Sequence, residues 1–297
     1  MASESIVPSQ SYSKPIATRQ TLDKNAYAFI TEWNSLNDAR FLAELLQNKI
    51  KVRHSYKPFT LDGKTYERGS LIITRGDNNS NPLFPEVLGE IATKHFITLE
   101  TTATGFVDEG KDFGSRYVQM IPNQKIAVLS GEPTSTYRFG EIWHFFEQQL
   151  NHPISVIDSD YMDRVDFSAY DVLILPGGYG YKSFFDEKKL TELKDWVSQG
   201  GKLIAMGGAI KGLTGENGFS IKAKEMAKDS SKNLQVFDET QRESIKMSIS
   251  GAIFRTKVDN THPLAYGYPD TYFSLKLGSD AYGYLDQGSV VYLEQGN

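Results

Sequence analysis

Cysteine is absent from the 297 residues of this chain. Without a thiol, the protein can form no disulfide, no thiolate metal site and no cysteine nucleophile. The absence leaves the cellular compartment open, because proteins without disulfides occur in reducing and in oxidising surroundings alike. Enzyme chemistry that depends on a thiol is therefore excluded for this chain.

An excess of positive charge and long apolar runs are also missing. The 32 Lys and Arg residues are outnumbered by 37 Asp and Glu residues, which gives a net charge of −5. A chain without a basic field does not attract nucleic acid, so no nucleic-acid partner is expected. No apolar run approaches the roughly 18 residues that a membrane-spanning helix needs, so no membrane span is predicted.

The chain does contain enough apolar and aromatic surface for packed cores. Hydrophobic residues make up 39% and aromatic residues 12% of the sequence, which is typical of a folded protein. The length fits two domains. We expect a Ser-, Pro- and Gln-rich leader or linker over residues 1–22, a small α/β domain over 23–122, and a larger domain over 123–297.

The first domain is predicted from apolar residues that either alternate, as in strands, or recur at helical spacing. The predicted elements are a strand within 25–33, a helix over 37–46 that Ser35 or Asn37-Asp38 can cap, strands at 50–56 and 69–74 that form a hairpin with a turn at 61–64, a helix over 84–91, and a loop over 101–115. This mixture predicts a small α/β domain that ends near Pro122.

The second domain alternates short apolar strands with helices. The predicted strands are 125–130, 154–157, 170–175 and 202–206, and the predicted helices are 140–150 and 190–198, the latter closed by Gly200 and Gly201. Nearly continuous apolar strands are typical of a parallel sheet that is buried on both faces. The spacing predicts right-handed βαβ units in a doubly wound, mostly parallel, flavodoxin-like sheet.

Ligands of such sheets bind beyond the carboxyl ends of the strands. Three of the predicted strands end in glycine, and a charged pair follows the first of them closely. The candidate cleft residues are Gly131, Arg138, Glu141, Gly177, Gly178, Tyr179, Gly207 and Gly208. The glycine run at 177–180 lacks the Lys-Ser/Thr of a phosphate-binding loop, although its backbone amides could bind an anion.

The three glycine-bearing strand ends resemble the class I glutamine amidotransferase-like fold. Residues 173–178, Leu-Ile-Leu-Pro-Gly-Gly, resemble the family strand whose backbone amides lie near an oxyanion. Gly201-Lys-Leu-Ile-Ala-Met-Gly-Gly-Ala209 resembles the strand that runs into the nucleophile elbow, and it places Gly208 where the family carries cysteine. Glycine tolerates the positive φ of such an elbow but supplies no nucleophile. The resemblance therefore implies a scaffold or binding role without catalysis.

A second resemblance covers nearly the whole chain, to the region downstream of the catalytic domain in large bacterial zinc carboxypeptidases of Bacteroidetes type. The matching motifs are Phe41-Leu-Ala-Glu-Leu-Leu46, Lys57-Pro-Phe59, Tyr66-Glu-Arg-Gly-Ser-Leu-Ile-Ile73, Thr104-Gly-Phe106, Asp112-Phe-Gly-Ser115 and Gly140-Glu-Ile-Trp-His-Phe-Phe-Glu147. The resemblance implies an upstream zinc peptidase domain in the same polypeptide, which would be this chain's partner, a periplasmic or secreted location, and a chain truncated at both ends.

His144, Glu147 and His262 could imitate the H-x-x-E plus distant His set of a zinc peptidase. The first two lie inside the predicted helix 140–150, in the amidotransferase-like half, and the Asn-Arg dipeptide that binds the substrate carboxylate in that family is absent. We therefore expect no metal and no cofactor in this chain, and expect zinc only in the upstream domain. His262 could match a triad histidine, but a general base without a nucleophile has no substrate proton to take.

The leading hypothesis is a non-catalytic accessory region of a zinc carboxypeptidase. The alternative is a module that binds a peptide, a glycan or another small molecule at the cleft. A cluster of aromatic residues near the C-terminus, Tyr266, Tyr268, Tyr272, Phe273, Tyr282 and Tyr284, is either part of a β-rich core edge or a binding face. A hydrolase with a Ser or Asp nucleophile is disfavoured, because residues 206–209 contain neither.

Overall fold

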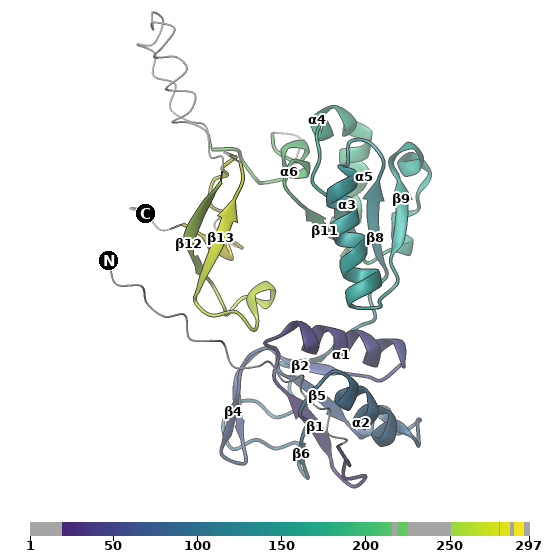
Figure 1. Cartoon of the computed structure of the whole chain (residues 1–297), viewed down its shortest axis with the longest axis vertical. Helices are drawn as coiled ribbons and strands as arrows, with labels where there is room; N and C mark the ends of the chain where they lie inside the picture. The colour runs from purple at the N-terminus through teal and green to yellow at the C-terminus, as the bar shows by residue number, and fades with distance from the viewer. Residues whose placement is uncertain (1–19, 216–218, 225–250, 279, 286–287, 294–297) are drawn as a thin grey trace, which may run out of the picture.

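The computed structural model describes residues 20–215, 219–224, 251–278, 280–285 and 288–293. It contains two α/β units and a small antiparallel sheet (Figure 1). The predicted mixed α/β class is confirmed at this level. Most of the predicted leader or linker lies outside the described residues. Among the described residues, no helix is both long enough and apolar enough to cross a membrane.

The first unit is built on a five-stranded antiparallel sheet of order β6-β1-β5-β2-β7. Its strands are β1 (Ala28–Thr31), β2 (Arg53–Ser55), β5 (Leu71–Thr74), β6 (Glu100–Thr102) and β7 (Val118–Met120), with helices α1 (Leu36–Gln47) and α2 (Phe84–Lys94). The predicted pairing of the second and third strands is confirmed, with Arg53 opposite Ile72. A separate hairpin, β3 (Phe59–Leu61) and β4 (Lys64–Tyr66), is inserted between them.

Both faces of this first sheet are covered. One face packs Phe29, Leu71 and Ile73 against the two helices, and the other packs Ile30 and Ile72 against the β3–β4 hairpin and the loop before β7. As a result, every residue of β1 and of β5 is buried.

The first unit includes residues that precede residue 23, its predicted start. The Gln20 side chain donates to the carbonyl of Ile97 and accepts from the amide of Leu99, and Leu22 packs against the core. Sequence periodicity does not predict these contacts, because they are made by isolated side chains and not by a helix or strand.

The second unit contains a four-stranded sheet of order β11-β10-β8-β9 in which all neighbours are parallel. Its strands are β8 (Ile126–Ser130), β9 (Ser155–Asp158), β10 (Val172–Leu175) and β11 (Lys202–Ala205), and its helices are α3 (Thr136–Trp143), α4 (Tyr181–Phe184), α5 (Glu187–Ser198) and α6 (Ala209–Gly212). All four predicted strands are present. Helix α3 starts four residues before the predicted Gly140 (140 − 136) and continues as a π-helix, η2 (His144–Gln149).

The two faces of the parallel sheet are covered unequally. Helices α4, α5 and α6, with two 3₁₀ segments (η3, Ser159–Arg164; η4, Phe167–Ala169), bury one face. The other face carries α3 and η2 alone, packed on Val128, Val172 and Ile174. The edge strand β11 extends past this cover, so Ile204 remains 46% exposed.

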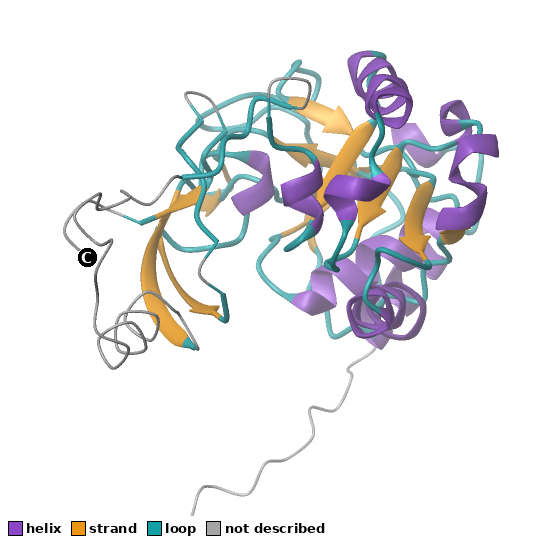
Figure 2. Cartoon of the chain, turned by 90° about the horizontal axis from the view of Figure 1, so that it is seen from above, coloured by secondary structure: helices purple, strands orange, loops and turns teal. Residues whose placement is uncertain are grey.

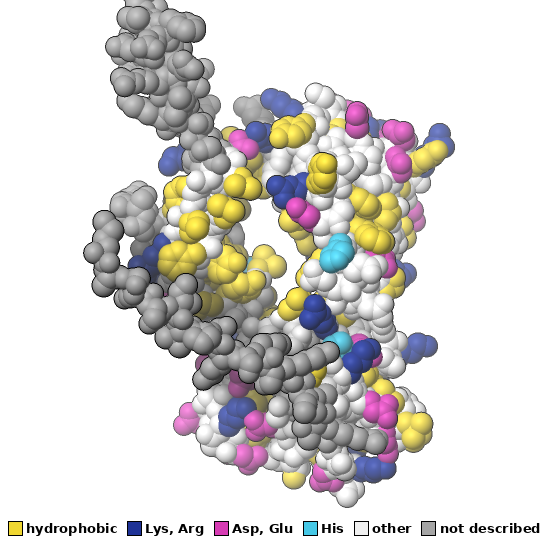
Figure 3. Space-filling model, viewed as in Figure 1, with side chains coloured by type: hydrophobic (Ala, Val, Ile, Leu, Met, Phe, Trp, Pro, Cys, Tyr) yellow, Lys and Arg dark blue, Asp and Glu magenta, His cyan; other side chains and the backbone are white. Residues whose placement is uncertain are grey.

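Residues 252–292 do not extend the parallel sheet. They form a separate antiparallel sheet of order β13-β12-β14, from β12 (Ala252–Val258), β13 (Thr271–Lys276) and β14 (Val291–Tyr292). Seen from above, the β12–β13 ribbon stands apart from the parallel sheet (Figure 2). Apolar side chains gather on it, beside an opening toward the second unit (Figure 3); Ile253 and Phe273 are 72% and 66% exposed.

Candidate functional site

A groove of about 550 Å³ lies on the less covered face of the parallel sheet, at the carboxyl ends of β10 and β11. The ends of neighbouring parallel strands share one edge of the sheet, which is why residues distant in sequence meet there. Its lining consists of Arg138, Glu141, Ile142, Phe145, Phe146, Ile174, Gly177, Ile204, Met206 and Gly207. The groove therefore contains four of the eight predicted cleft residues.

The charged residues of the groove are Arg138 and Glu141, one turn apart on α3. The Arg138 guanidinium nitrogen Nη1 donates to both carboxylate oxygens of Glu141, at 3.1 and 2.9 Å. Both side chains are more than half exposed, at 53% and 63%. An exposed pair of this kind contributes little to stability, so a ligand group can compete for either partner.

The walls of the groove are apolar. Ile142, Phe145 and Phe146 approach from α3 and η2, while Ile174, Ile204 and Met206 line the sheet side. These walls arise because α3 packs over β8 and β10 and leaves β11 uncovered. The helical spacing of residues 142, 145 and 146 is visible in the sequence, but the open side of the sheet opposite them is not.

The backbone at the end of β11 corrects the predicted elbow residue. Gly208 has φ −61°, an ordinary helical value, whereas Gly207 has φ 52° and lines the groove. A side chain at Gly208 would place its Cβ 1.9 Å from the Gly178 carbonyl oxygen, but at Gly207 the nearest atom would be 3.6 Å away. The positive φ expected at Gly208 therefore lies at Gly207, and Gly208 is a point of close backbone approach.

The other predicted cleft residues have structural roles or lie outside the groove. The Gly178 backbone packs against Pro133, where a Cβ would lie 1.9 Å from the carbonyl oxygen. The backbone of Gly131 lies against Ser159, in the segment that follows β9. Tyr179 is 93% exposed and does not line the groove.

The loops around the groove are held by buried hydrogen bonds. The Tyr181 hydroxyl lies 2.8 Å from Thr134 Oγ1 and donates to the carbonyl of Pro176 at 2.7 Å. Burial raises the pKa of Tyr181, so its hydroxyl remains a donor. These bonds tie the loop after β8 to the loop after β10 and fix one end of the groove.

In the described part of the chain, each residue that could imitate a zinc site has a hydrogen-bond partner other than the remaining two. These residues are His144, Glu147 and His262. His144 Nδ1 lies 3.4 Å from Gln149 Nε2, and the Glu147 carboxylate accepts from the amide of Ile154 at 3.2 Å. His262 Nδ1 accepts from the amide of Leu264 and caps a 3₁₀ turn, η5 (Pro263–Ala265). Among the described residues, no cluster of three His, Cys, Asp or Glu residues could hold a metal ion.

Comparison with known proteins gives no relative: no family model, no curated protein and no solved structure matches this chain. The function must therefore be inferred from the site itself. A groove with apolar walls and an exposed ion pair can bind a small ligand. The residue at its elbow, Gly207, has no side chain that could act as a nucleophile.

Proposed function

We propose that this chain is a non-catalytic accessory region of a zinc carboxypeptidase, and that its second unit is a flavodoxin-like, amidotransferase-like domain without a nucleophile. The observation that supports this best is Gly207, which combines the positive φ of an elbow with a position in the groove and has no side chain. Peptide hydrolysis and zinc would then belong to an upstream domain of the same polypeptide, in a periplasmic or secreted protein.

An accessory region of this kind would act by packing against the peptidase domain, presenting substrate to it, or contacting a partner. Its own contribution to bond cleavage would be nil, because a general base such as His262 has no side-chain nucleophile at the elbow to deprotonate.

The direct test is a carboxypeptidase assay on this chain with and without added zinc. We expect no release of C-terminal residues from peptides in either condition. Zinc-dependent release that disappears in His144→Ala, and persists in a His95→Ala control, would overturn the proposal. Sequencing the gene upstream of the codon for Met1 tests the parent's identity, since an H-x-x-E peptidase domain is expected there.

A second function, favoured by the apolar groove, is the binding of a small molecule or peptide. Its volume, about 550 Å³, falls within the range of small-molecule sites, roughly 300–1,000 Å³. A ligand would place apolar groups against Phe145, Phe146 and Ile204, and polar groups against Arg138 and Glu141.

The lack of cysteine makes this second function easy to test. In Gly207→Cys the single thiol would lie in the groove, whereas in Gly140→Cys it would lie on α3 with no atom near its Cβ. We expect a groove ligand found by thermal-shift screening to slow iodoacetamide labelling of the first variant and not of the second. Equal labelling rates with and without every stabilising compound would exclude binding at this groove.

A further inference from the structure

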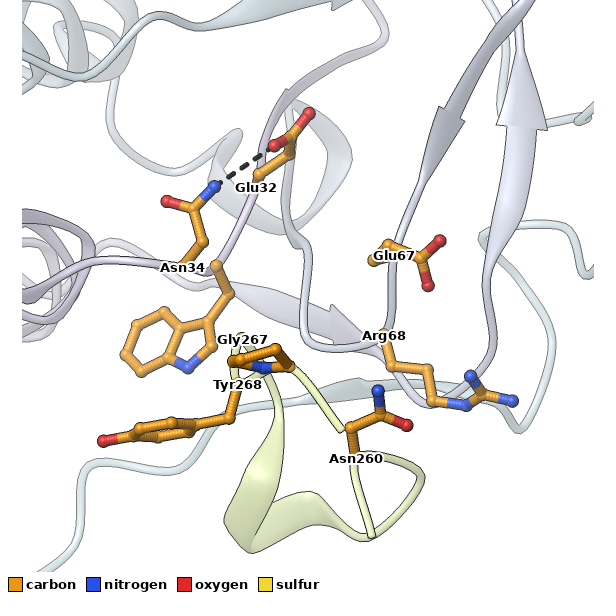
Figure 4. Close-up of a pocket in the computed structure, with 9 residues that line it drawn as sticks. Glu32, Asn34, Glu67, Arg68, Asn260, Gly267 and Tyr268 are labelled. Atoms are coloured by element: carbon orange, nitrogen blue, oxygen red, sulfur yellow. Dashed lines mark hydrogen bonds between the residues drawn. The ribbon is translucent and has the colours of Figure 1, made fainter. Parts of the chain in front are cut away.

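A second cavity, of about 380 Å³, lies where the antiparallel ribbon contacts the first unit. Three segments that are distant in sequence line it: the residues after β1, the residues after β4, and the loop between β12 and β13 (Figure 4). Its principal side chains are Glu32, Trp33, Glu67, Arg68, Asn260 and Tyr268. None of them lines the groove of the second unit.

The junction that forms this cavity is tightly packed. Tyr266, from the loop after β12, is only 8% exposed, and its ring lies 6.5 Å from that of His54 and 6.4 Å from that of Tyr56. The next residue, Gly267, has φ 83°, and a Cβ there would lie 2.4 Å from the Trp33 carbonyl oxygen. Such a close approach requires glycine and holds the loop against the first unit.

The wall contributed by the first unit is fixed by the cap of α1. The backbone amides of Asn34 and Ser35 both donate to Asp38 Oδ2, at 3.0 and 2.7 Å. Asp38 is buried, and Ser35 accepts from its amide in a capping box. The segment that carries Glu32 and Trp33 is therefore anchored to a helix and does not need a ligand to order it.

Aromatic and polar groups are separated within the cavity. The aromatic residues Trp33 and Tyr268 line the cavity. Glu32, Glu67 and Arg68 lie farther toward the β1 and β4 ends, and the Arg68 side chain points away from Tyr268 (Figure 4). Within the described part of the chain, the side chains of Glu67, Arg68 and Asn260 have no hydrogen-bond partner. The pKa of the Asp259 carboxyl is lowered by a hydrogen bond from Thr261 and also by the positive charge of Arg68, which lies close to it. Glu67 and Asn260 are exposed and Arg68 is half-buried, so their polar groups are hydrated and available to a ligand.

Negative charge exceeds positive charge in the lining, which holds the carboxylates of Glu32 and Glu67 and the guanidinium of Arg68. Glu32 lies 3.4 Å from Lys64, which is outside the cavity and also pairs with Glu100, and Asn34 donates to the other Glu32 carboxylate oxygen at 3.2 Å. The lining therefore does not favour an anionic ligand. A neutral ligand rich in groups that both donate and accept hydrogen bonds matches this arrangement.

We infer that this cavity binds a saccharide. The ring C–H groups of a sugar would pack against the negative faces of Trp33 and Tyr268. Its hydroxyls would donate to Glu67 and accept from Arg68 and Asn260, which satisfies groups that are otherwise open to solvent. The inference does not rest on the proposed accessory role, because the cavity lies at the ribbon junction and not at the elbow groove.

The test is saturation-transfer NMR and calorimetry on the whole chain with cellobiose, lactose, mannobiose and diacetylchitobiose as probes. We expect at least one disaccharide to bind at millimolar concentration, with the strongest transfer at its ring C–H protons. Tyr268→Ala is expected to weaken binding about three- to tenfold through loss of the aromatic contact. A deoxy analogue of the bound sugar that lacks the hydroxyl bonded to Glu67 should bind more weakly than the parent sugar, by a similar or larger factor.

The matched control is Tyr161→Ala, which removes a tyrosine of similar exposure, 57% against 53%, from the second unit. Glu67→Gln tests the carboxylate without a change of shape, and circular dichroism confirms that each variant is folded. No binding of any probe, binding that Tyr268→Ala and Glu67→Gln leave unchanged, or binding of a Gly-Leu dipeptide in place of every sugar would each overturn the inference.

Discussion

The central strands of the first sheet and the strands β10 and β11 of the second are similarly apolar, but they are covered differently. In the antiparallel sheet of the first unit, β1 and β5 are buried along their whole length by helices on one face and a hairpin on the other. In the parallel sheet, β10 is buried in the same way, while its neighbour β11 alternates between half-buried and exposed residues. The apolar groove is the part of the second sheet that lacks a cover.

An apolar strand in the sequence therefore predicts the position of a sheet. It does not predict whether other elements cover both faces of that sheet. Parallel sheets are usually covered on both faces, yet one face here carries only α3 and η2. The uncovered strip beside Ile174 is where small molecules have room to bind. Truncation of an apolar side chain should therefore change the free energy of unfolding by different amounts in the two sheets.

The largest expected difference is between core truncations in the two sheets. Phe29→Ala removes a side chain that is 1% exposed and should lower the free energy of unfolding by about 3–5 kcal/mol. Ile204→Ala, at 46% exposure, should cost less than about 1 kcal/mol, since much of its surface is already in water. Urea unfolding measures both.

Ile174→Ala is the matched control, because Ile174 is 4% exposed and lies directly beside Ile204 in the sheet. It should cost about 2–5 kcal/mol. If Ile204→Ala proved as costly as Ile174→Ala, the face beside β11 would be filled and the comparison between the sheets would fail.

The next effect concerns the glycines at the end of β11. Gly208→Ala forces a Cβ to 1.9 Å from a backbone oxygen and should cost about 1–3 kcal/mol or more, because neither backbone can move freely. Gly207→Ala has space but a φ of 52°, which costs roughly 1–2 kcal/mol for an L-residue. Thermal unfolding with Gly140→Ala, expected to stabilise α3 by roughly 0.5–1 kcal/mol, completes the series. A larger effect at Gly207 than at Gly208 would contradict the close backbone approach assigned to Gly208.

Ion pairs give a third contrast. The Arg53 guanidinium donates two hydrogen bonds to Asp77 at 2.6 and 2.9 Å and lowers the pKa of this carboxyl below its ordinary 3.8. A lowered folded-state pKa means that the stabilisation is complete above pH 3.8 and is lost as the pH falls through the folded-state pKa. Asp77→Asn should cost about 1–3 kcal/mol at neutral pH, and should flatten the acid limb of a stability–pH curve.

The corresponding pair of the second unit, Arg138 and Glu141, is exposed. Glu141→Gln should therefore change the free energy of unfolding by less than about 0.5 kcal/mol. An effect as large as that of Asp77→Asn would show that the groove pair is structural and not available to a ligand.

The smallest expected effect is at the ribbon junction. Burial lowers the pKa of His54, which lies against Tyr56 and Tyr266. The unfolded chain therefore binds the proton more tightly, and stability should decline slightly as the pH falls below 6.5. His54→Gln should remove this decline. An NMR titration that found the His54 pKa at or above 6.5 would contradict the burial of the ring.

Much of the secondary structure could be predicted because it follows from local patterns. The apolar runs of β8, β10 and β11, the capping of α1 at Ser35, which was one of two proposed positions, and the glycine pair that follows α5 are local properties, and the structure contains all of them. The positive φ expected at Gly208 lies at Gly207. A Gly-Gly pair does not reveal which residue turns and which allows another strand to approach.

The sequence by itself determined that no thiol chemistry is available, that the chain is mixed α/β and that glycines end the parallel strands. These conclusions need only composition and short-range periodicity. Only the tertiary structure decided that β11 is left uncovered, that Gly207 lines a groove, and that Tyr266 brings Trp33 and Tyr268 together around a second cavity. The physical reason is that both sites depend on what packs on each surface, and that is set by contacts between residues far apart in the chain.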